Sequence, residues 1–379
     1  MSSNKPGSKE RISVGLLFGG RSGEHEVSLA SARGILEAID KNKYEVLCIG
    51  ITKDGTWIVG DDPMAVLEGR LDRDTVRPMD AVLSVKSAQS RGSADPSKGF
   101  MLQDLDVVFP ILHGPFGEDG TVQGFLELLG IPYVGAGVMA SSLVMDKVLC
   151  KQALAASGLQ GLPYQAFLRR QWDDSPETVI ADCERELSYP MFVKPANMGS
   201  SVGISKANNR DALQVGIEDA FCFDRKILVE QGIDAREIEI SVLGNDQPIA
   251  STPGEIVPSR DFYSYAAKYL DDASELLIPA PLSPAQEETV RTLAVHAYKA
   301  VDCSGMARVD FLVDRISGEV WLNELNTLPG FTPISMYPKL WEASGTGYSA
   351  LIDRLLQLAL ERHEERSRLM TSFDVSQAT

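Results

Sequence analysis

The sequence is poor in cysteine. Its 379 residues include five cysteines, which are widely scattered, odd in number and never arranged as a CxxC pair. Disulfide frameworks and structural zinc sites need cysteines that are paired at characteristic spacings. We therefore exclude both kinds of site and expect free thiols in a reducing cytosol.

Long apolar runs and excess positive charge are also missing. No stretch approaches the roughly 20 apolar residues of a transmembrane helix, and the polar N-terminus, MSSNKPGSKERIS, lacks the apolar centre of a secretory signal. Lysine and arginine number 36 against 53 acidic residues, for a net charge of −17. Because nucleic-acid binding requires a basic face, we exclude nucleic-acid and membrane partners and expect a cytoplasmic protein that acts on small molecules.

The order of the predicted elements indicates a mixed fold. The first third alternates apolar strands, such as RISVGLLFGG and DVVFPILHG, with helices, which is typical of a parallel α/β domain. The remainder mixes short strands with helices, so the fold class is α/β and α+β. The chain has no internal repeat, and its length allows two or three domains at roughly 150 residues each. We expect three consecutive units, at 11–138, 139–231 and 232–368.

One predicted hairpin, RVDFLVDRISGEVWLNELN, contains an unusual pair of carboxylates. If it is centred on Ser317, Asp310 lies opposite Glu324 and Arg308 opposite Asn326, all on one face. Opposed like charges destabilise a strand pair, so one carboxylate is protonated, a cation neutralises both, or the register is wrong. Mg²⁺ takes such oxygen ligands, and Arg308 suits a carboxylate or phosphate. The alternative is a solvent-exposed acidic edge.

A second signal is FVKPANMGSSVGIS, in which Lys194 ends a strand before a turn rich in glycine and serine. Backbone N–H groups of such a turn can surround phosphate oxygens. The order of a P-loop is absent, and glycine–serine turns alone are common. Together with the carboxylate pair, the turn predicts a metal–triphosphate site. Glu230 and Glu237, near the ends of apolar strands, would bind ribose hydroxyls or would simply be solvated strand ends.

Two further segments follow buried strands near the N-terminus. In FGGRSGEHEVSLAS, Glu24 and Glu26 fall at the start of a helix, where the macrodipole stabilises negative charge. His113 follows another strand, in HGPFGEDG. Loops after parallel strands commonly hold ligands in α/β proteins, although a lone histidine is more often a structural group.

Taken in order, these segments resemble the D-alanine–D-alanine ligases of the ATP-grasp superfamily, from about residue 12 to residue 360. The matching motifs include GGRSGEHEVSLAS, HGPFGEDGTVQG, MDK, VKPANMGSSVGISK, REIEISVLG, FYSYAAKY, ARVDF and NELNTLPGFTPIS. The resemblance implies an ATP-grasp fold behind an N-terminal α/β domain. It also implies a cytoplasmic homodimer that uses ATP and two Mg²⁺ ions, or Mn²⁺, to join two D-alanines through D-alanyl phosphate for peptidoglycan precursors.

The resemblance assigns nucleotide and metal roles to single residues. The lysines for the ATP phosphates are Lys147 and Lys194, and the covering loop is Gly199, Ser200 and Ser201. The residues around adenine and ribose are Glu230, Ile233 and Glu237. The metal ligands are Asp310, Glu324, which bridges the ions, and Asn326.

Substrate roles follow from the same resemblance. Glu26 matches the carboxylate near the amino group of the first D-alanine. The residues around the second substrate and the tetrahedral intermediate are Arg308, Gly330 and Ser335, and His113 is also expected to bind substrate. In a mobile loop over 259–275, Tyr269 is expected to bond with Ser200 and Glu26.

The identity of the acceptor is expected to depend on the mobile loop. The pair Lys268-Tyr269 resembles ligases that use a second D-alanine, whereas Lys-Phe resembles those that use D-lactate. The loop departs from the family at Ser264, where aspartate is common, and at Ala266, where glutamate is frequent. Two alternatives remain: a ligase of the same fold that accepts D-serine or D-lactate, and a degenerate nucleotide-binding module.

Overall fold

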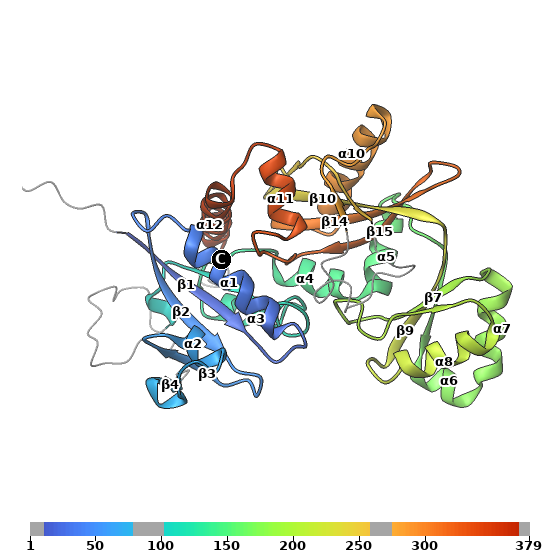
Figure 1. The fold of residues 1–379 in the computed structure, drawn as a ribbon, viewed down its shortest axis with the longest axis horizontal. Coiled ribbons are helices and arrows are strands. Elements are labelled where there is room, and N and C mark those ends of the chain that lie inside the picture. The colour runs from blue at the N-terminus through green and yellow to red at the C-terminus, as the bar shows by residue number, and fades with distance from the viewer. Residues whose placement is uncertain (1–10, 79–101, 258–274, 371–379) are drawn as a thin grey trace, which may run out of the picture.

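The computed structural model describes residues 11–78, 102–257 and 275–370, which form three β-sheets with helices around them (Figure 1). The loop expected over 259–275, with Lys268 and Tyr269, lies outside the described residues except at its last residue. Among the described helices, none has the length and apolar content needed to cross a bilayer. All five cysteines are free thiols, as expected.

The first sheet has the strand order β4-β3-β2-β1-β5. Its parallel strands are β1 (Ile12–Gly19), β2 (Tyr44–Ile51) and β5 (Val107–Ile111). Two antiparallel strands that we did not predict extend it, β3 (Trp57–Gly60) and β4 (Val76–Pro78). The parallel α/β prediction is thus confirmed for β1, β2 and β5.

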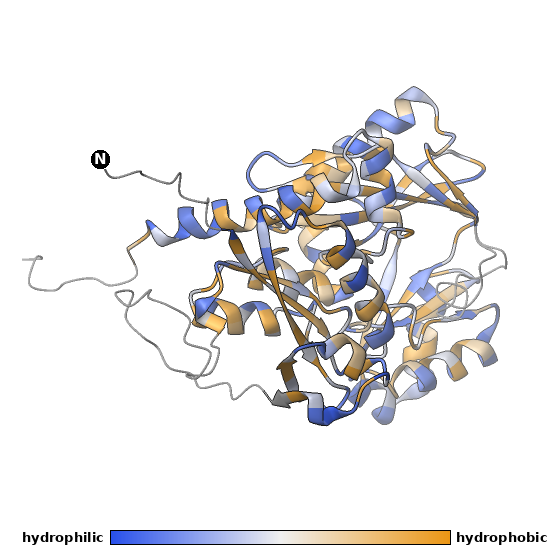
Figure 2. Ribbon diagram, turned by 60° about the vertical axis from the view of Figure 1, so that its left-hand side comes forward, coloured by the Kyte–Doolittle hydropathy of each residue, from blue (hydrophilic) through white to orange (hydrophobic). Residues whose placement is uncertain are grey.

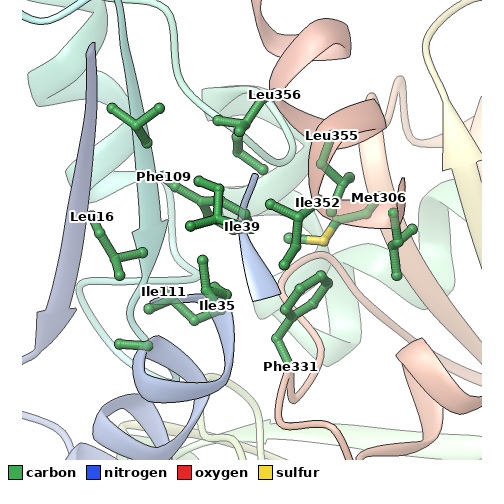
Figure 3. Close-up of a cluster of buried hydrophobic side chains, with 14 of the residues drawn as sticks. Leu16, Ile35, Ile39, Phe109, Ile111, Met306, Phe331, Ile352, Leu355 and Leu356 are labelled. Carbon is green, nitrogen blue, oxygen red and sulfur yellow. The ribbon is translucent and has the colours of Figure 1, made fainter. Parts of the chain in front are cut away.

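Helices cover both faces of this sheet, and one of them comes from the far end of the chain. The nearby helices are α1 (His25–Ala38), α2 (Pro63–Leu67) and α3 (Thr121–Leu128). The distant helix is α12 (Tyr348–Ser367). Its Ile352, Leu355 and Leu356 pack in one buried cluster with Leu16 and Phe109 of the first sheet (Figure 3). The expected partition at 138 and 231 therefore stays a proposal, with α12 contributing to the first core.

A break at Asp146 divides the helical segment from 138 to 156 into two helices. The structure has α4 (Val138–Met145) and α5 (Lys147–Ala156). Asp146 leaves the helical conformation, at φ −86° and ψ 99°, and its carboxylate accepts hydrogen bonds from the N–H groups of Val148 and Leu149. This N-cap begins a new helix and places Lys147 at its first position.

The second sheet is antiparallel, in the order β6-β9-β7-β8. Its strands are β6 (Tyr164–Leu168), β7 (Met191–Pro195), β8 (Ser205–Ala207) and β9 (Lys226–Gln231). Its helices are α6 (Arg169–Asp174), α7 (Pro176–Glu186) and α8 (Arg210–Ala220). The first two of these helices were not predicted.

The third sheet runs β13-β12-β10-β14-β15, with β11 paired to β10. Its strands are β10 (Ala235–Gly244), β11 (Ile249–Ala250), β12 (Gly254–Val257), β13 (Glu275–Leu277), β14 (Gly305–Asp314) and β15 (Val320–Asn326). Its helices are α10 (Pro284–Ala300) and α11 (Met336–Ala343).

Alternation along the third sheet decides where polar groups can lie. Ile238 and Ile240 of β10, with Val309 and Phe311 of β14, pack in the core that α10 covers. The intervening residues point to the opposite face. In Figure 2 the strands at the centre are largely orange, and blue segments occur along many of the helices. Polar side chains at the intervening positions of β10 and β14 therefore point away from α10.

Candidate active site

A cavity of about 1040 Å³ lies between the three sheets. Its walls come from the loop before α1, the start of α5, the turn after β7, the β14–β15 hairpin and α11. It is large enough for a nucleotide together with a small substrate. Most of the residues predicted from the sequence meet here.

The hairpin has the expected pairing at its inner end. Asp310 lies opposite Glu324, and Arg308 opposite Asn326. Because paired residues share a face, the two carboxylates do face each other on the side away from α10. The predicted register is confirmed for these pairs.

A β-bulge makes this pairing possible. Phe311 pairs with Leu322, one step out of the register that Asp310 and Glu324 keep, so Asn323 is the extra residue of β15. Without this residue, Glu324 would be displaced to the other face of the sheet. Bulges redirect side chains near functional sites, and this one directs Glu324 into the cavity.

The cation beside the facing carboxylates is Arg308. Its Nε and terminal N–H groups donate to the two oxygens of Asp310 at 2.7 and 2.6 Å. Nε also lies 3.0 Å from Oε2 of Glu239, a buried residue of β10 directly opposite Asp310. Burial lowers the pKa of Arg308, but attraction to Asp310 and Glu239 outweighs it and raises the pKa above its ordinary value. Arg308 therefore compensates the negative charges of Asp310 and Glu239 within the sheet.

The glycine–serine turn after β7 forms another wall. Ser200 and Ser201 have φ of +50° and +58°, a left-handed conformation that non-glycine residues rarely adopt. Lys147 reaches over the turn and donates from Nζ to the carbonyl of Met198 at 2.6 Å. The strained turn and the lysine are directed at the cavity together with Gly199, which suits a phosphate-binding site.

Ser200 and Glu26, the two residues that Tyr269 is expected to contact, lie in different surroundings. Ser200 Oγ donates to Glu24, whose side chain is buried. Glu26 borders the cavity, but its carboxylate is about two-thirds exposed and accepts a hydrogen bond from Lys53 Nζ at 2.5 Å. Residues two apart on a helix point in different directions, so only one of the two glutamates can face the turn.

His113 is buried at the rim of this region. Its Nε2 lies 3.2 Å from Ser31 Oγ, and its Nδ1 lies 3.2 Å from the carbonyl of Leu328 and 3.6 Å from Oε1 of Glu118. Burial raises the pKa of Glu118, and the nearby Glu24 adds to the rise. Burial lowers the pKa of His113, but Glu118 and Glu24 raise it above its ordinary value. His113 thus joins α1 to the loop after β15.

Glu230 lies behind two lysines. It is 2% exposed, and Lys194 Nζ donates to its Oε2 at 2.5 Å. Lys151 of α5, which the sequence analysis did not identify, forms an ion pair with Oε1. Both lysines line the cavity, whereas Glu230 does not.

Gly330 and Ser335 lie together at the start of α11. A Cβ added to Gly330 would come within 3.1 Å of Ser335 Oγ, and that hydroxyl accepts a hydrogen bond from the N–H of Thr332 at 3.1 Å. Lys339, one turn further along α11, adds a positive charge to this wall. It was not predicted.

The structure therefore gathers most of the predicted residues but not all. Those that line the cavity are Glu26, His113, Lys147, Lys194, Gly199, Ser200, Ser201, Arg308, Glu324, Asn326, Gly330 and Ser335. Among the predicted residues that the structure describes, those outside this lining are Asp310, Glu230, Ile233 and Glu237. Arg308 covers Asp310, and the two lysines cover Glu230.

The donors available to a metal ion are few but chemically uniform. Within 11–78, 102–257 and 275–370, no three histidine, cysteine, aspartate or glutamate residues are grouped as a metal site. Asp310, Glu324 and Asn326 supply two carboxylates and an amide. These oxygen donors are the type that Mg²⁺ prefers when substrate phosphates complete its coordination. They fit a nucleotide-bound Mg²⁺ and do not resemble a site that holds an ion by itself.

Comparison with known proteins gives a consistent result over nearly the whole chain. The family described as D-ala D-ala ligase N-terminus matches residues 13–136, and D-ala D-ala ligase C-terminus matches residues 153–357. The D-alanine–D-alanine ligase of Natranaerobius thermophilus is 50% identical over 97% of this chain and 100% of its own. That of a Thermoanaerobacter species is 52% identical over 95% and 99%.

Solved structures agree. The D-alanine–D-alanine ligase of Coxiella burnetii superimposes with a TM-score of 0.83 at 36% identity, covering 98% of this chain and 100% of that one. The VanG D-Ala:D-Ser ligase of Enterococcus faecalis gives a TM-score of 0.81, also at 36% identity, over 92% and 100%.

Proposed function

Because this chain belongs to the D-alanine–D-alanine ligase family, we propose that it joins two D-alanines to D-alanyl-D-alanine with hydrolysis of ATP to ADP and phosphate. The ATP-grasp fold expected from the sequence is confirmed by the match to solved ligases. The observation that carries the proposal is the position of Arg308. It lies in one cavity with the lysines and turn suited to phosphates and with Gly330 and Ser335.

In the first step, the carboxylate of one D-alanine attacks the γ-phosphorus of ATP, and the bond to the β-phosphate oxygen breaks. Lys147, Lys194 and the N–H groups of the 199–201 turn hold the phosphates, and Arg308 offsets charge on the transferred group, as phosphoryl transfer requires. Glu24 binds the amino group of this D-alanine. Its buried carboxylate, bonded to Ser200, supports this role better than the exposed Glu26.

In the second step, the amine of the other D-alanine attacks the D-alanyl phosphate. The tetrahedral oxyanion is stabilised by Arg308 and by the N–H of Gly330, which act as preorganised donors. Ser335 lies beside Gly330 and orients the acceptor. Phosphate then leaves with the electron pair of the C–O bond and takes up the proton that the attacking amine loses.

We propose that Asp310, Glu324 and Asn326 hold Mg²⁺ when nucleotide is bound, with two ions expected from the family. The metal would offset negative charge on the β- and γ-phosphates. Glu239 also pairs with Arg308, so the guanidinium would keep a carboxylate partner if Asp310 held the ion.

The acceptor is proposed to be D-alanine, on the basis of the pair Lys268-Tyr269. D-serine is the alternative, supported by the similarity to the VanG ligase. A cytoplasmic location, a homodimer and a role in peptidoglycan precursor synthesis are proposed from the family, and the free thiols are in keeping with a reducing compartment.

The test is phosphate release from Mg-ATP with D-alanine, with L-alanine, or with D-alanine plus D-serine or D-lactate, with products identified by mass. Release only with D-alanine, giving the dipeptide, is expected. A mixed product in preference to the dipeptide would reject the acceptor and retain the ligase. ATP binding without phosphate release under any of these conditions would favour a degenerate nucleotide-binding module.

A further inference from the structure

One buried carboxylate in this protein is shared by two lysines. Glu230, at the end of β9, has Lys194 on Oε2 at 2.5 Å and Lys151 on Oε1. Burial raises the pKa of Glu230, but Lys151 and Lys194 outweigh it and lower the pKa to about 2. The carboxylate is therefore ionised at neutral pH, and both of its oxygens are occupied.

The two lysines differ in how firmly they are held. Lys151 is 9% exposed, its Nζ lies 5.8 Å from the centre of the Tyr164 ring, and a Cβ added to Gly161 would be 3.2 Å from that Nζ. Lys194 is 15% exposed and lies close to the glycine–serine turn after β7. The carboxylates of Glu324 and Glu237 also attract it. Lys151 is thus fixed by its surroundings, whereas Lys194 has other charged groups nearby.

We propose that Lys151 is a positioning residue for base recognition: it keeps Glu230 ionised and oriented after Lys194 leaves that carboxylate for the nucleotide phosphates. This inference rests on the proposed function, in which Lys194 binds phosphate and Glu230 faces adenine. Movement of Lys194 exposes Oε2, which then accepts an N–H from the 6-amino group of the purine. Lys151 remains on Oε1.

The physical reason is the cost of an isolated buried charge. A carboxylate left without a cation in this position would take up a proton or lose its orientation. A protonated or displaced Glu230 no longer offers a defined acceptor to the amino group. Lys151 therefore contributes to the choice of base without touching the nucleotide.

This role makes a specific prediction about nucleotide preference. ATP carries the 6-amino group, and purine riboside 5′-triphosphate is the same molecule without it. A site built to accept that N–H discriminates strongly against the analogue. Loss of Lys151 should remove this discrimination, whereas loss of an unrelated lysine should not.

The experiment measures binding of ATP and of purine riboside triphosphate by calorimetry, in the presence of Mg²⁺ and without D-alanine. Lys151→Met keeps the aliphatic stem and removes the charge, Lys151→Arg keeps the charge, and Lys206→Met on the exposed face of β8 is the matched control. We expect Lys151→Met to weaken ATP binding by about 10- to 100-fold, the range typical for loss of a group that orients a binding residue. Binding of purine riboside triphosphate should change much less, Lys151→Arg should recover most of the preference, and Lys206→Met should behave as wild type.

The inference is overturned if Lys151→Met leaves the ratio of the two binding constants unchanged. Equal weakening for both nucleotides would indicate a general structural role, and wild-type binding of both would show that Lys151 has no role in base recognition. If Lys151→Met does not fold, Lys151→Gln gives the same comparison with a smaller loss of polarity. Because binding is read without amino acids, the result is separate from the ligase proposal. Wild-type phosphate release with D-alanine tests that proposal by itself.

Discussion

Ser200 donates a hydrogen bond to the carboxylate of Glu24, a residue 176 positions earlier in the sequence. The bond joins the glycine–serine turn after β7 to the loop before α1. The carboxylate of Glu24 therefore links this turn to the first sheet. A Cβ added to Gly114, which has φ +76°, would lie 2.9 Å from the other oxygen of Glu24. Only a glycine leaves room for the carboxylate in this position.

This contact predicts that Glu24→Gln impairs the enzyme and that Glu26→Gln has little effect. Glutamine at position 24 keeps the shape but removes the charge that would pair with the amino group of the first D-alanine. A charge-assisted hydrogen bond contributes about 1.5–3 kcal/mol, so we expect kcat/KM for D-alanine to fall by at least tenfold. Phosphate release at varied D-alanine concentration gives this value for both variants. A larger defect in Glu26→Gln would restore the original assignment to Glu26.

The β14–β15 hairpin predicts a metal-dependent defect in Glu324→Gln. Replacing one carboxylate oxygen with an amide removes a negative charge from the proposed Mg²⁺ ligands, so the ion and the phosphates bind less well. We expect a marked fall in kcat and a higher Mg²⁺ concentration for half-maximal activity. Wild-type turnover and an unchanged Mg²⁺ requirement in the variant would refute the metal assignment.

Glu239 is expected to matter through Arg308. In Glu239→Gln the guanidinium keeps the ionised carboxylate of Asp310 but loses that of Glu239, so Arg308 would be held less firmly if Asp310 bound the metal. Mutation of a residue that holds a site residue in place, without itself contacting metal or substrate, typically lowers activity by about 10- to 100-fold. We expect a loss of kcat in that range. Glu255→Gln is the control, because Glu255 is also buried in this sheet and paired with an arginine, Arg236, at 2.6 Å. Equal losses of kcat in both variants would show a general effect on the sheet.

How far the sequence determines this site can be seen in the hairpin. Centring it on Ser317 gave the right partners for Asp310 and Arg308, but it placed Phe311 opposite Asn323, whereas Phe311 pairs with Leu322. The prediction succeeded at the inner end because the extra residue in β15 shifts the register there. Turn chemistry sets pairing near the loop, and nothing in the local sequence marks the bulge.

Other residues could not be found because their partners are far apart in the chain. Glu239 lies opposite Asp310 only because β10 pairs with β14, and Lys151 meets Glu230 only because α5 lies against β9. The different environments of Glu24 and Glu26 have a local reason. A shift of two residues at a helix start turns a side chain from the cavity to solvent, and the motif contains a glutamate at both positions.

The buried Glu230 predicts a specific dependence of stability on pH. Its pKa in the folded protein, about 2, lies below the ordinary value of 4.5 because Lys151 and Lys194 outweigh the effect of burial. A lowered pKa stabilises the folded state above pH 4.5, and this contribution is lost as the pH falls from 4.5 towards 2. In urea unfolding, wild type should exceed Glu230→Gln in free energy of unfolding at pH 7, and the gap should narrow below pH 4.5. Glu365→Gln, on the exposed end of α12, should show no such gap.

The C-terminal helix should be essential to the first sheet. Leu355 of α12 is fully buried in the cluster with Leu16, Phe109 and Phe331 (Figure 3). Leu355→Ala removes apolar contacts and leaves a cavity at the junction of helix and sheet, and such changes typically lower the free energy of unfolding by about 2–5 kcal/mol. Leu369→Ala is the control, since that side chain is 66% exposed and its loss should change stability by less than about 0.5 kcal/mol. Both are measured by denaturant unfolding followed by tryptophan fluorescence. If α12 were only an appendage to the third sheet, the strands of the first sheet would keep their hydrogen-exchange protection in Leu355→Ala. We expect β1 and β5 to lose protection together with α12, because the three share one core.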